Sequence, residues 1–307
     1  MKIRSSVDHT TQKSETSLFP VLPVVQALAL MATLFISTQA YALAEFEYAK
    51  PAGWGMLEKS AYTGGHYSNV HIYKNSLGND SYDTIVALVD IAKGARVDMM
   101  QYDTGERRNG HSTFWMNSIE YWWNQMPTNS SRVLVVNGQF FGDGEKNRKA
   151  TLSFAIKDNG HLYPSADPNS INKTAKQVNI FRNNVTVTDA YAGNYVEHHA
   201  PTAIIGRNIN DLSKSGMGLG RTYLCAMPTI RGNVLLIYVA YKKTADQAKD
   251  DLLRWDCHEN NTAALDGSGS TQMRTKGGNT LYGASNPLGW SDKREIPQVI
   301  GIYNDAH

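Results

Sequence analysis

One stretch near the end of the chain decides the expected fold: "NVLLIYVAYKKTADQAKDDLLRWDCHENNTAALDGSGSTQM", residues 233–273. Its first part, Asn233–Tyr241, is a continuous apolar run of strand length. A helix is predicted after this run, because Thr244 and Gln247 form the signature of a capping box. A second apolar run follows at Thr262–Asp266. A strand, a helix and a strand in this order predict a right-handed crossover between parallel strands.

A second helix is predicted earlier in the chain, from about Ser112 to Pro127, where proline ends it. It is followed by the apolar run Arg132–Asn137, which predicts another strand. Apolar side chains at helical spacing support the helix, and they are Trp115, Ile119, Trp122 and Met126.

Two segments predict antiparallel hairpins. In Thr151–Tyr163, the pair Asn159-Gly160 lies between apolar runs and favours a type I′ turn. In Val178–Tyr191, the pair Asn183-Asn184 occupies the corresponding place. Hairpins and a crossover together predict an α+β fold with a mixed sheet and helices packed on that sheet.

Residues 45–307 contain no internal repeat and no linker rich in proline and serine, so we expect a single domain there. The formal net charge of the whole chain is +2, which is too small to indicate a nucleic acid or a membrane surface as partner.

The first 44 residues predict export. A polar start is followed by the apolar run Phe19–Ile36, and then by two overlapping A-x-A cleavage patterns that end at Ala42 and Ala44. We expect a signal peptide cleaved near Leu43 or Glu45, and a periplasmic or secreted protein without a membrane segment after cleavage. A retained N-terminal anchor is the alternative, since the run is about long enough to span a bilayer.

The chain has two cysteines, Cys225 and Cys257. In an oxidising compartment, two cysteines and no third predict a disulfide. Two buried free thiols are the alternative, because cysteine is among the most buried residue types.

The end of the second run is the candidate active site. Asp266 and Asn137 each end a predicted strand, and each is followed by glycine. Polar side chains at strand ends are a common place for ligands, and glycine lets a ligand approach the backbone closely. The small residues after Asp266 expose N–H groups that can bind an oxyanion. Two ordinary turns are the alternative, because Asp-Gly and Asn-Gly are common turn pairs.

Four motifs resemble, in the same order, those of the phosphodiester glycosidase family. They are "VNGQFF" (136–141), "APTAIIG" (200–206), "AALDGSGSTQM" (263–273) and "REIPQVIGIY" (294–303). The resemblance covers more than half of the chain after residue 44, and the acidic, glycine-rich corner is its most specific part.

The resemblance implies a site on particular residues. Those that match the family pattern are Asn137, Thr202, Asp266, Gly267, Gly269 and Ser270. Ser268 replaces the middle glycine of the family corner, a mild change if its backbone φ is negative. Pro201 replaces an arginine that would bind a substrate phosphate, and Arg207 or Arg221 is expected to substitute for it.

We therefore expect an exported glycoside hydrolase that cleaves a sugar from a glycan or a sugar phosphodiester. Hydrolysis of this kind usually needs two carboxyl groups. Asp266 is the first, Asp143 the expected second with Glu197 behind it, and Asn137 is expected to act with them. In one variant Asp266 and Asn137 hold a divalent cation, calcium or magnesium. The alternative function is an inactive glycan-binding or surface protein, and a cation beside Asp266 would favour the enzyme.

Overall fold

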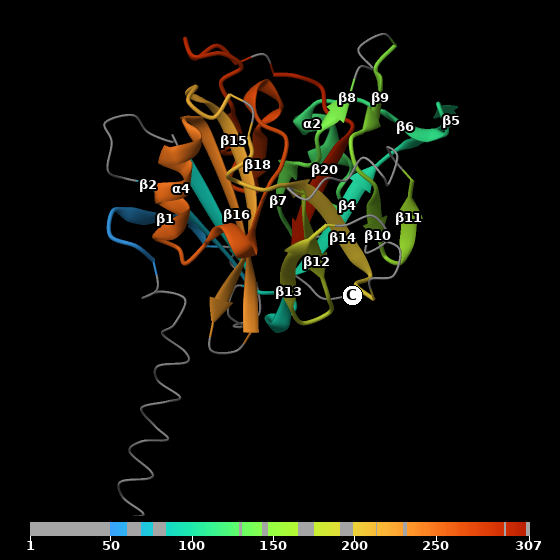
Figure 1. Ribbon diagram of the computed structural model, residues 1–307. Helices are drawn as coiled ribbons and strands as arrows, with labels where there is room; N and C mark the ends of the chain where they lie inside the picture. Colours follow the sequence, from blue (N-terminus) through green and yellow to red (C-terminus); the bar gives the residue numbers. More distant parts are fainter. Residues whose placement is uncertain are drawn as a thin grey trace, which may run out of the picture. The chain divides into compact units, whose positions relative to one another are not determined.

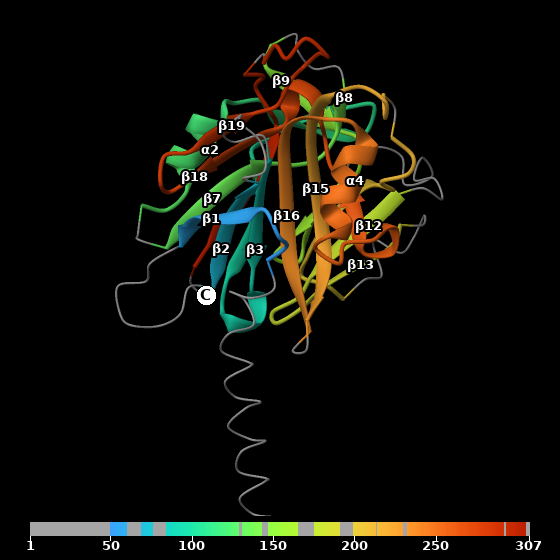
Figure 2. The same cartoon turned by 90° about the vertical axis from the view of Figure 1, so that its left-hand side faces the viewer.

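Antiparallel strands build most of the chain, as the computed structural model shows (Figures 1 and 2). The residues that the structure describes are 50–59, 69–75, 84–128, 131–142, 147–164, 175–190, 199–212, 214–229, 232–291 and 293–304. Residues 51–307 form one compact unit. The predicted signal peptide or anchor, residues 1–44, lies outside the described residues. Within them, neither helix has the length and hydrophobicity needed to span a bilayer.

The largest sheet has eleven strands. Its main path, in spatial order, is β1 (Trp54–Lys59), β2 (Val70–Asn75), β3 (Thr84–Val89), β16 (Gly232–Lys243), β15 (Leu219–Thr229), β17 (Thr262–Ala264), β14 (Thr202–Arg207), β10 (Ile156–Asp158) and β11 (His161–Tyr163). Two further strands join it beside β14, namely β12 (Ala175–Ile180), which pairs with β14, and β13 (Val185–Asp189), which pairs with β12.

Two smaller sheets complete the strands. The second sheet has the order β19 (Thr280–Tyr282), β18 (Gln272–Thr275), β7 (Arg132–Asn137), β20 (Gln298–Tyr303) and β4 (Arg96–Gln101). The third has the order β5 (Asp103–Arg108), β6 (His111–Trp115), β9 (Lys149–Leu152) and β8 (Phe141–Gly142). The described helical elements are η1 (Ile91–Lys93), α2 (Ile119–Gln125), α4 (Ala245–Leu253), η3 (Glu259–Asn261) and η4 (Ser268–Ser270).

The predicted α+β class with a mixed sheet is wrong, because the described strand pairs are antiparallel and helices are few. Helix α4 connects β16 to β17, but these two strands are not neighbours in the sheet. One edge of β16 carries β15 and the other carries β3, so neither edge is left for β17. β17 pairs with β15 and β14 instead.

The predicted helix from Ser112 begins later. Residues His111–Trp115 form β6, which pairs with β5 and β9. The helix α2 starts at Ile119, because the Ser118 side chain caps it by accepting a hydrogen bond from Tyr121 N at 3.2 Å. Trp115 is accordingly 43% exposed and lies outside the helix.

Other local predictions are confirmed. The capping box at Thr244 and Gln247 starts α4. The hairpins β10–β11 and β12–β13 are both antiparallel. Asn159 and Gly160 have φ of 46° and 83°, the left-handed values that a type I′ turn requires.

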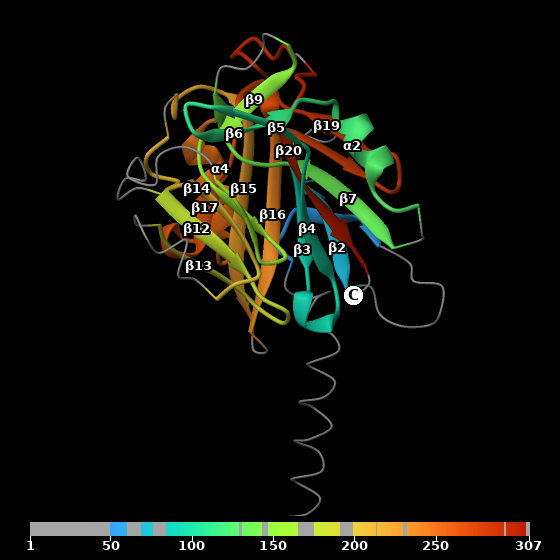
Figure 3. The ribbon, with the colours of Figure 1, turned by 90° about the vertical axis from the view of Figure 1, so that its right-hand side faces the viewer.

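The main core lies between the first and second sheets, which Figure 3 shows side by side. The side chains that β7 contributes to this core are Val133, Leu134 and Val136, whereas Val135 packs with α2 in a second cluster. Burying one such side chain stabilises the fold by about 1.5–3 kcal/mol. Helix α4 lies on the outer face of the first sheet, where Tyr238 of β16 donates a hydrogen bond to Asp251 at 2.9 Å.

The Cys225–Cys257 disulfide predicted from the sequence is present. Cys225 is in the middle of β15 and Cys257 follows the end of α4, with 6.0 Å between the Cα atoms. Both residues are fully buried, so the bridge fixes the end of the helix on the sheet.

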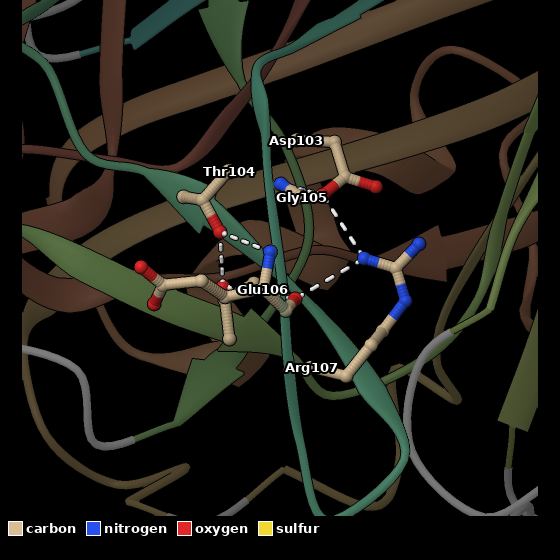
Figure 4. A network of polar contacts seen from close by, with 6 residues as sticks. Asp103, Thr104, Gly105, Glu106 and Arg107 are labelled. Atoms are coloured by element: carbon tan, nitrogen blue, oxygen red, sulfur yellow. Dashed lines mark hydrogen bonds and ion pairs between the residues drawn. The ribbon is translucent and has the colours of Figure 1, made fainter.

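The edge strand β5 is irregular (Figure 4). Its pairing with β6 shifts between Asp103 and Arg107, and Gly105 inside this bulge has a φ of 76°. Asp103 Oδ1 accepts hydrogen bonds from Gly105 N at 2.8 Å and from Arg107 Nη1 at 3.2 Å. A bulge and charged side chains on an exposed edge disfavour pairing with another strand.

Candidate active site

A pocket opens where β14, β15 and β17 meet. Ala264 of β17 pairs with Arg207 of β14 on one side and with Tyr223 of β15 on the other. Paired residues of neighbouring strands point to the same face, so these side chains share the outer face of the sheet. Asp266 lies two residues beyond Ala264 and also lines the pocket. Asp266 therefore reaches the pocket from the segment directly after β17.

Asp266 is the only carboxyl group among the described residues that line the pocket. Protein surrounds most of this side chain, and burial raises the pKa of Asp266 to about 6. The Ser270 hydroxyl, the positive charges of Arg294 and Arg207, and the Gly267 N–H act in the opposite direction. Desolvation exceeds these contributions, so the carboxyl can change its protonation state near neutral pH.

Two arginines are directed to the pocket by aromatic rings. The guanidinium carbon of Arg207 lies 5.2 Å from the ring centre of Phe140, and that of Arg294 lies 4.6 Å from the ring centre of Phe141. Both arginines line the pocket and both lower the pKa of Asp266 through their charge. Stacked guanidinium groups can bind a phosphate or carboxylate in a bidentate manner.

Arg221, the other arginine expected from the sequence, is engaged elsewhere. Its guanidinium donates to the backbone oxygens of Lys243 at 3.0 Å, Lys214 at 2.8 Å and Met217 at 2.9 Å. The residue is buried and fixes the loop before β15. It therefore shapes the wall of the pocket, and backbone oxygens engage its Nε and Nη2.

Asn137 lies close to Asp266, as the sequence analysis expected, but it lies beneath the pocket. It is only 1% exposed, and its Nδ2 donates to the backbone oxygen of Asp266 at 2.8 Å. Its Oδ1 accepts from the Thr222 hydroxyl at 2.8 Å and from Gln272 N at 3.0 Å. Since this oxygen already has two donors, it does not suit a divalent cation shared with Asp266.

The glycine-rich corner forms the short helix η4. Ser268 has a φ of 57°, so the condition for a mild exchange with glycine is not met. Gly220 lets the corner approach β15, since a Cβ there would lie 2.4 Å from Ser268 O. Gly267 and Ser268 line the pocket, whereas Gly269 and Ser270 are buried behind it.

The remaining expected residues are placed apart from the pocket or are not described. Thr202 starts β14, at the opposite end of the strand from Arg207, and its hydroxyl faces Asn159 N at 3.4 Å. Asp143 and Glu197 lie outside the described residues. Among the described residues, no group of three or more His, Cys, Asp or Glu side chains is arranged to hold a metal ion.

Sequence reasoning did not identify Arg294, Thr222 and Gln272 as site residues. Arg294 opens the last of the four matching motifs, so its position was a usable signal. Thr222 is in an apolar strand and Gln272 follows the corner, and their role depends on contacts with Asn137 across the fold.

Comparison with known proteins gives a distant structural relationship. No protein-family model matches the chain, and no curated protein matches its sequence. The catalytic domain of zebrafish N-acetylglucosamine-1-phosphodiester alpha-N-acetylglucosaminidase, auto-inhibited by its pro-peptide, is similar with a TM-score of 0.52 and 16% identity over 83% of this chain and 89% of that chain. A hypothetical protein from Synechocystis has a TM-score of 0.46 and 8% identity over 77% of this chain and 62% of that chain. At these identities the likeness shows a glycosidase-like fold and no more.

Proposed function

We propose that this protein is a glycoside hydrolase that cleaves a sugar linked to an anionic group, such as a sugar phosphodiester, and that Asp266 transfers the proton. The observation that carries the proposal is a carboxyl group with a pKa of about 6 in the same pocket as two ring-stacked arginines. The zebrafish neighbour acts, by its name, on a phosphodiester-linked sugar, which supports this choice of substrate.

The reaction follows from the charges in the pocket. A phosphate monoester leaves as an anion, so its departure needs positive charge, which Arg207 and Arg294 supply. Water oxygen bonds to the sugar carbon, the bond from that carbon to the phosphate oxygen breaks, and its electron pair leaves with the phosphate. The ionised Asp266 accepts the proton of the water. A general base is most effective when its pKa is near the working pH.

A substrate with a neutral leaving group would need a second carboxyl as acid. We keep Asp143, with Glu197 behind it, as the proposed source of that group. In the sequence Asp143 follows Gly142, and the neighbouring Phe141 stacks on Arg294, which lines the pocket.

The test compares a sugar phosphodiester with an aryl glycoside of the same sugar. Asp266→Asn should lower kcat on the phosphodiester by about 10²–10⁴-fold, the range for loss of a general base. Full activity in this variant would refute the role of Asp266. Saturable glycan binding by wild type and variant alike, with no turnover of either substrate, would support the inactive binding protein instead.

We further propose that the chain is exported with cleavage near Leu43 or Glu45. The buried Cys225–Cys257 disulfide is consistent with an oxidising compartment. Mass spectrometry of the protein from the periplasm or medium should give a chain that begins at one of these residues. A chain that still begins at Met1 would favour the retained anchor.

A further inference from the structure

A single side chain closes the corner that carries Asp266. Asn137 of β7 contacts the first residue of the corner, at Asp266 O, and the residue that follows it, at Gln272 N. Both ends of the corner are therefore hydrogen-bonded to the same side-chain amide. The segment between is mostly glycine and serine, which have little apolar surface with which to fix a loop by packing.

The orientation of this amide is determined by its backbone partners. A carbonyl oxygen can only accept and a backbone N–H can only donate, so Nδ2 must face Asp266 and Oδ1 must face Gln272. The Thr222 hydroxyl donates to the same Oδ1 at 2.8 Å from β15, a strand of the first sheet. A rotated amide would bring like groups together at Asp266 O and Gln272 N, whereas the Thr222 hydroxyl can donate or accept.

Backbone contacts add to the closure on the Asp266 side. Asp266 N donates to Gly138 O at 3.2 Å, and Leu265 N donates to Thr222 O at 2.9 Å. The carboxyl of Asp266 itself accepts from Gly267 N, its own neighbour in the corner, at 2.9 Å. The place of the carboxyl in the pocket is therefore set by the corner, and the place of the corner is set by Asn137 and Thr222.

We propose that Asn137 and Thr222 are positioning residues, which hold the corner from Asp266 to Gln272 so that the Asp266 carboxyl faces the pocket, and that Asn137, which lies beneath the pocket lining, does not touch the substrate. This inference rests on the proposed function where it takes Asp266 as the reacting group. It assigns to Asn137 a role different from direct catalysis, because all its polar atoms face protein.

The test uses the full chain with Asn137→Ala, Thr222→Val and Thr222→Ser. Valine keeps the shape of threonine without the hydroxyl, and serine restores the hydroxyl. We expect kcat to fall up to about 100-fold in Asn137→Ala, the size known for a small misplacement of a reacting group, with KM nearly unchanged. Thr222→Val should show a smaller loss, and Thr222→Ser should recover most of it.

A second readout does not depend on activity. The pKa of the Asp266 carboxyl, followed by NMR, should shift in Asn137→Ala and Thr222→Val and return in Thr222→Ser. None of the three variants replaces a charged group around this carboxyl. These groups are Arg207 of β14, Arg294 before β20, and Lys214 and Arg221 on the pocket wall.

The matched control is Asn233→Ala. Asn233 Nδ2 also donates to a backbone oxygen, that of Val185, at 2.8 Å, but it lies at the start of β16, among residues that do not line the pocket. The Asn233→Ala substitution should lower the Tm without changing the pKa of Asp266. If Thr222→Val lowers only the Tm, like the control, the positioning role is wrong. If the pKa shifts as expected while no glycoside is hydrolysed even by wild type, the positioning role stands and the proposed function fails.

Discussion

The guanidinium of Arg294 stacks 4.6 Å from the ring centre of Phe141, and this contact holds a positive charge beside Asp266. Phe141 belongs to β8 in the third sheet, whereas Asp266 follows β17 in the first. The carboxyl of the pocket thus follows a strand of the first sheet, whereas a side chain of the third sheet orients the Arg294 cation. A cation directed in this way loses little side-chain freedom when it binds an anion.

Replacement of either arginine should raise the pKa of Asp266 further above about 6, because a positive charge favours the ionised carboxyl. The rise should be larger for Arg294→Gln than for Arg207→Gln, since Arg294 makes the larger contribution. NMR titration of the Asp266 carboxyl measures both shifts. Arg182→Gln, an exposed arginine in the β12–β13 turn, is the control and should leave this pKa unchanged. Equal values in all four proteins would contradict the proximity of the two charges.

The raised pKa of Asp266 also predicts how stability depends on pH. The folded protein holds this proton more tightly than the unfolded chain, whose aspartate has a pKa near 3.8. Stability should therefore be highest below the unfolded value and should decrease as pH rises from about 4 to about 6. The loss is roughly 3 kcal/mol, from about two pKa units at 1.36 kcal/mol each.

Because other groups titrate in the same range, the measurement is the difference between wild type and Asp266→Asn. Urea unfolding should show the asparagine variant gaining stability relative to wild type as pH rises through this window, up to roughly 3 kcal/mol. A constant difference from pH 4 to pH 7 would show that the folded protein does not raise this pKa.

The sequence predicted those features that depend on neighbours in the chain. The capping box of α4 and the Asn159-Gly160 turn are determined by residues within a few positions of each other. The motifs also brought Asp266 and Asn137 together correctly, although 129 positions separate them.

Features that depend on distant partners were not predictable in this way. The strands β16 and β17, which α4 connects, are not neighbours in the sheet because β15 and β3 occupy both edges of β16. Arg221 lines the pocket, but its Nε and Nη2 bind backbone oxygens of a loop and a strand end. A single sequence does not show which strand occupies an edge or which carbonyl receives a guanidinium.

Removal of the disulfide should destabilise the domain. In the chain-entropy model, a bridge that joins residues 32 positions apart contributes about 3–4 kcal/mol. Cys225→Ala with Cys257→Ala should lower the free energy of unfolding by that amount, and wild type under reducing conditions should show a similar loss. Alkylation of the denatured, non-reduced protein should find no free thiol. Two reactive thiols would contradict the bridge.

Ser268→Gly should stabilise the protein by about 0.5–1 kcal/mol. Ser268 has a φ of 57°, where a side chain is strained, and glycine adopts this value without that strain. Ser268→Ala is the matched control, since alanine keeps a Cβ in the same conformation and should not reproduce the gain. Urea unfolding of the three proteins at one pH measures the difference. If alanine and glycine stabilise equally, the gain comes from loss of the hydroxyl and not from the backbone. If glycine instead lowers the free energy of unfolding, the backbone strain at Ser268 is too small to offset the added freedom that glycine gives the unfolded chain.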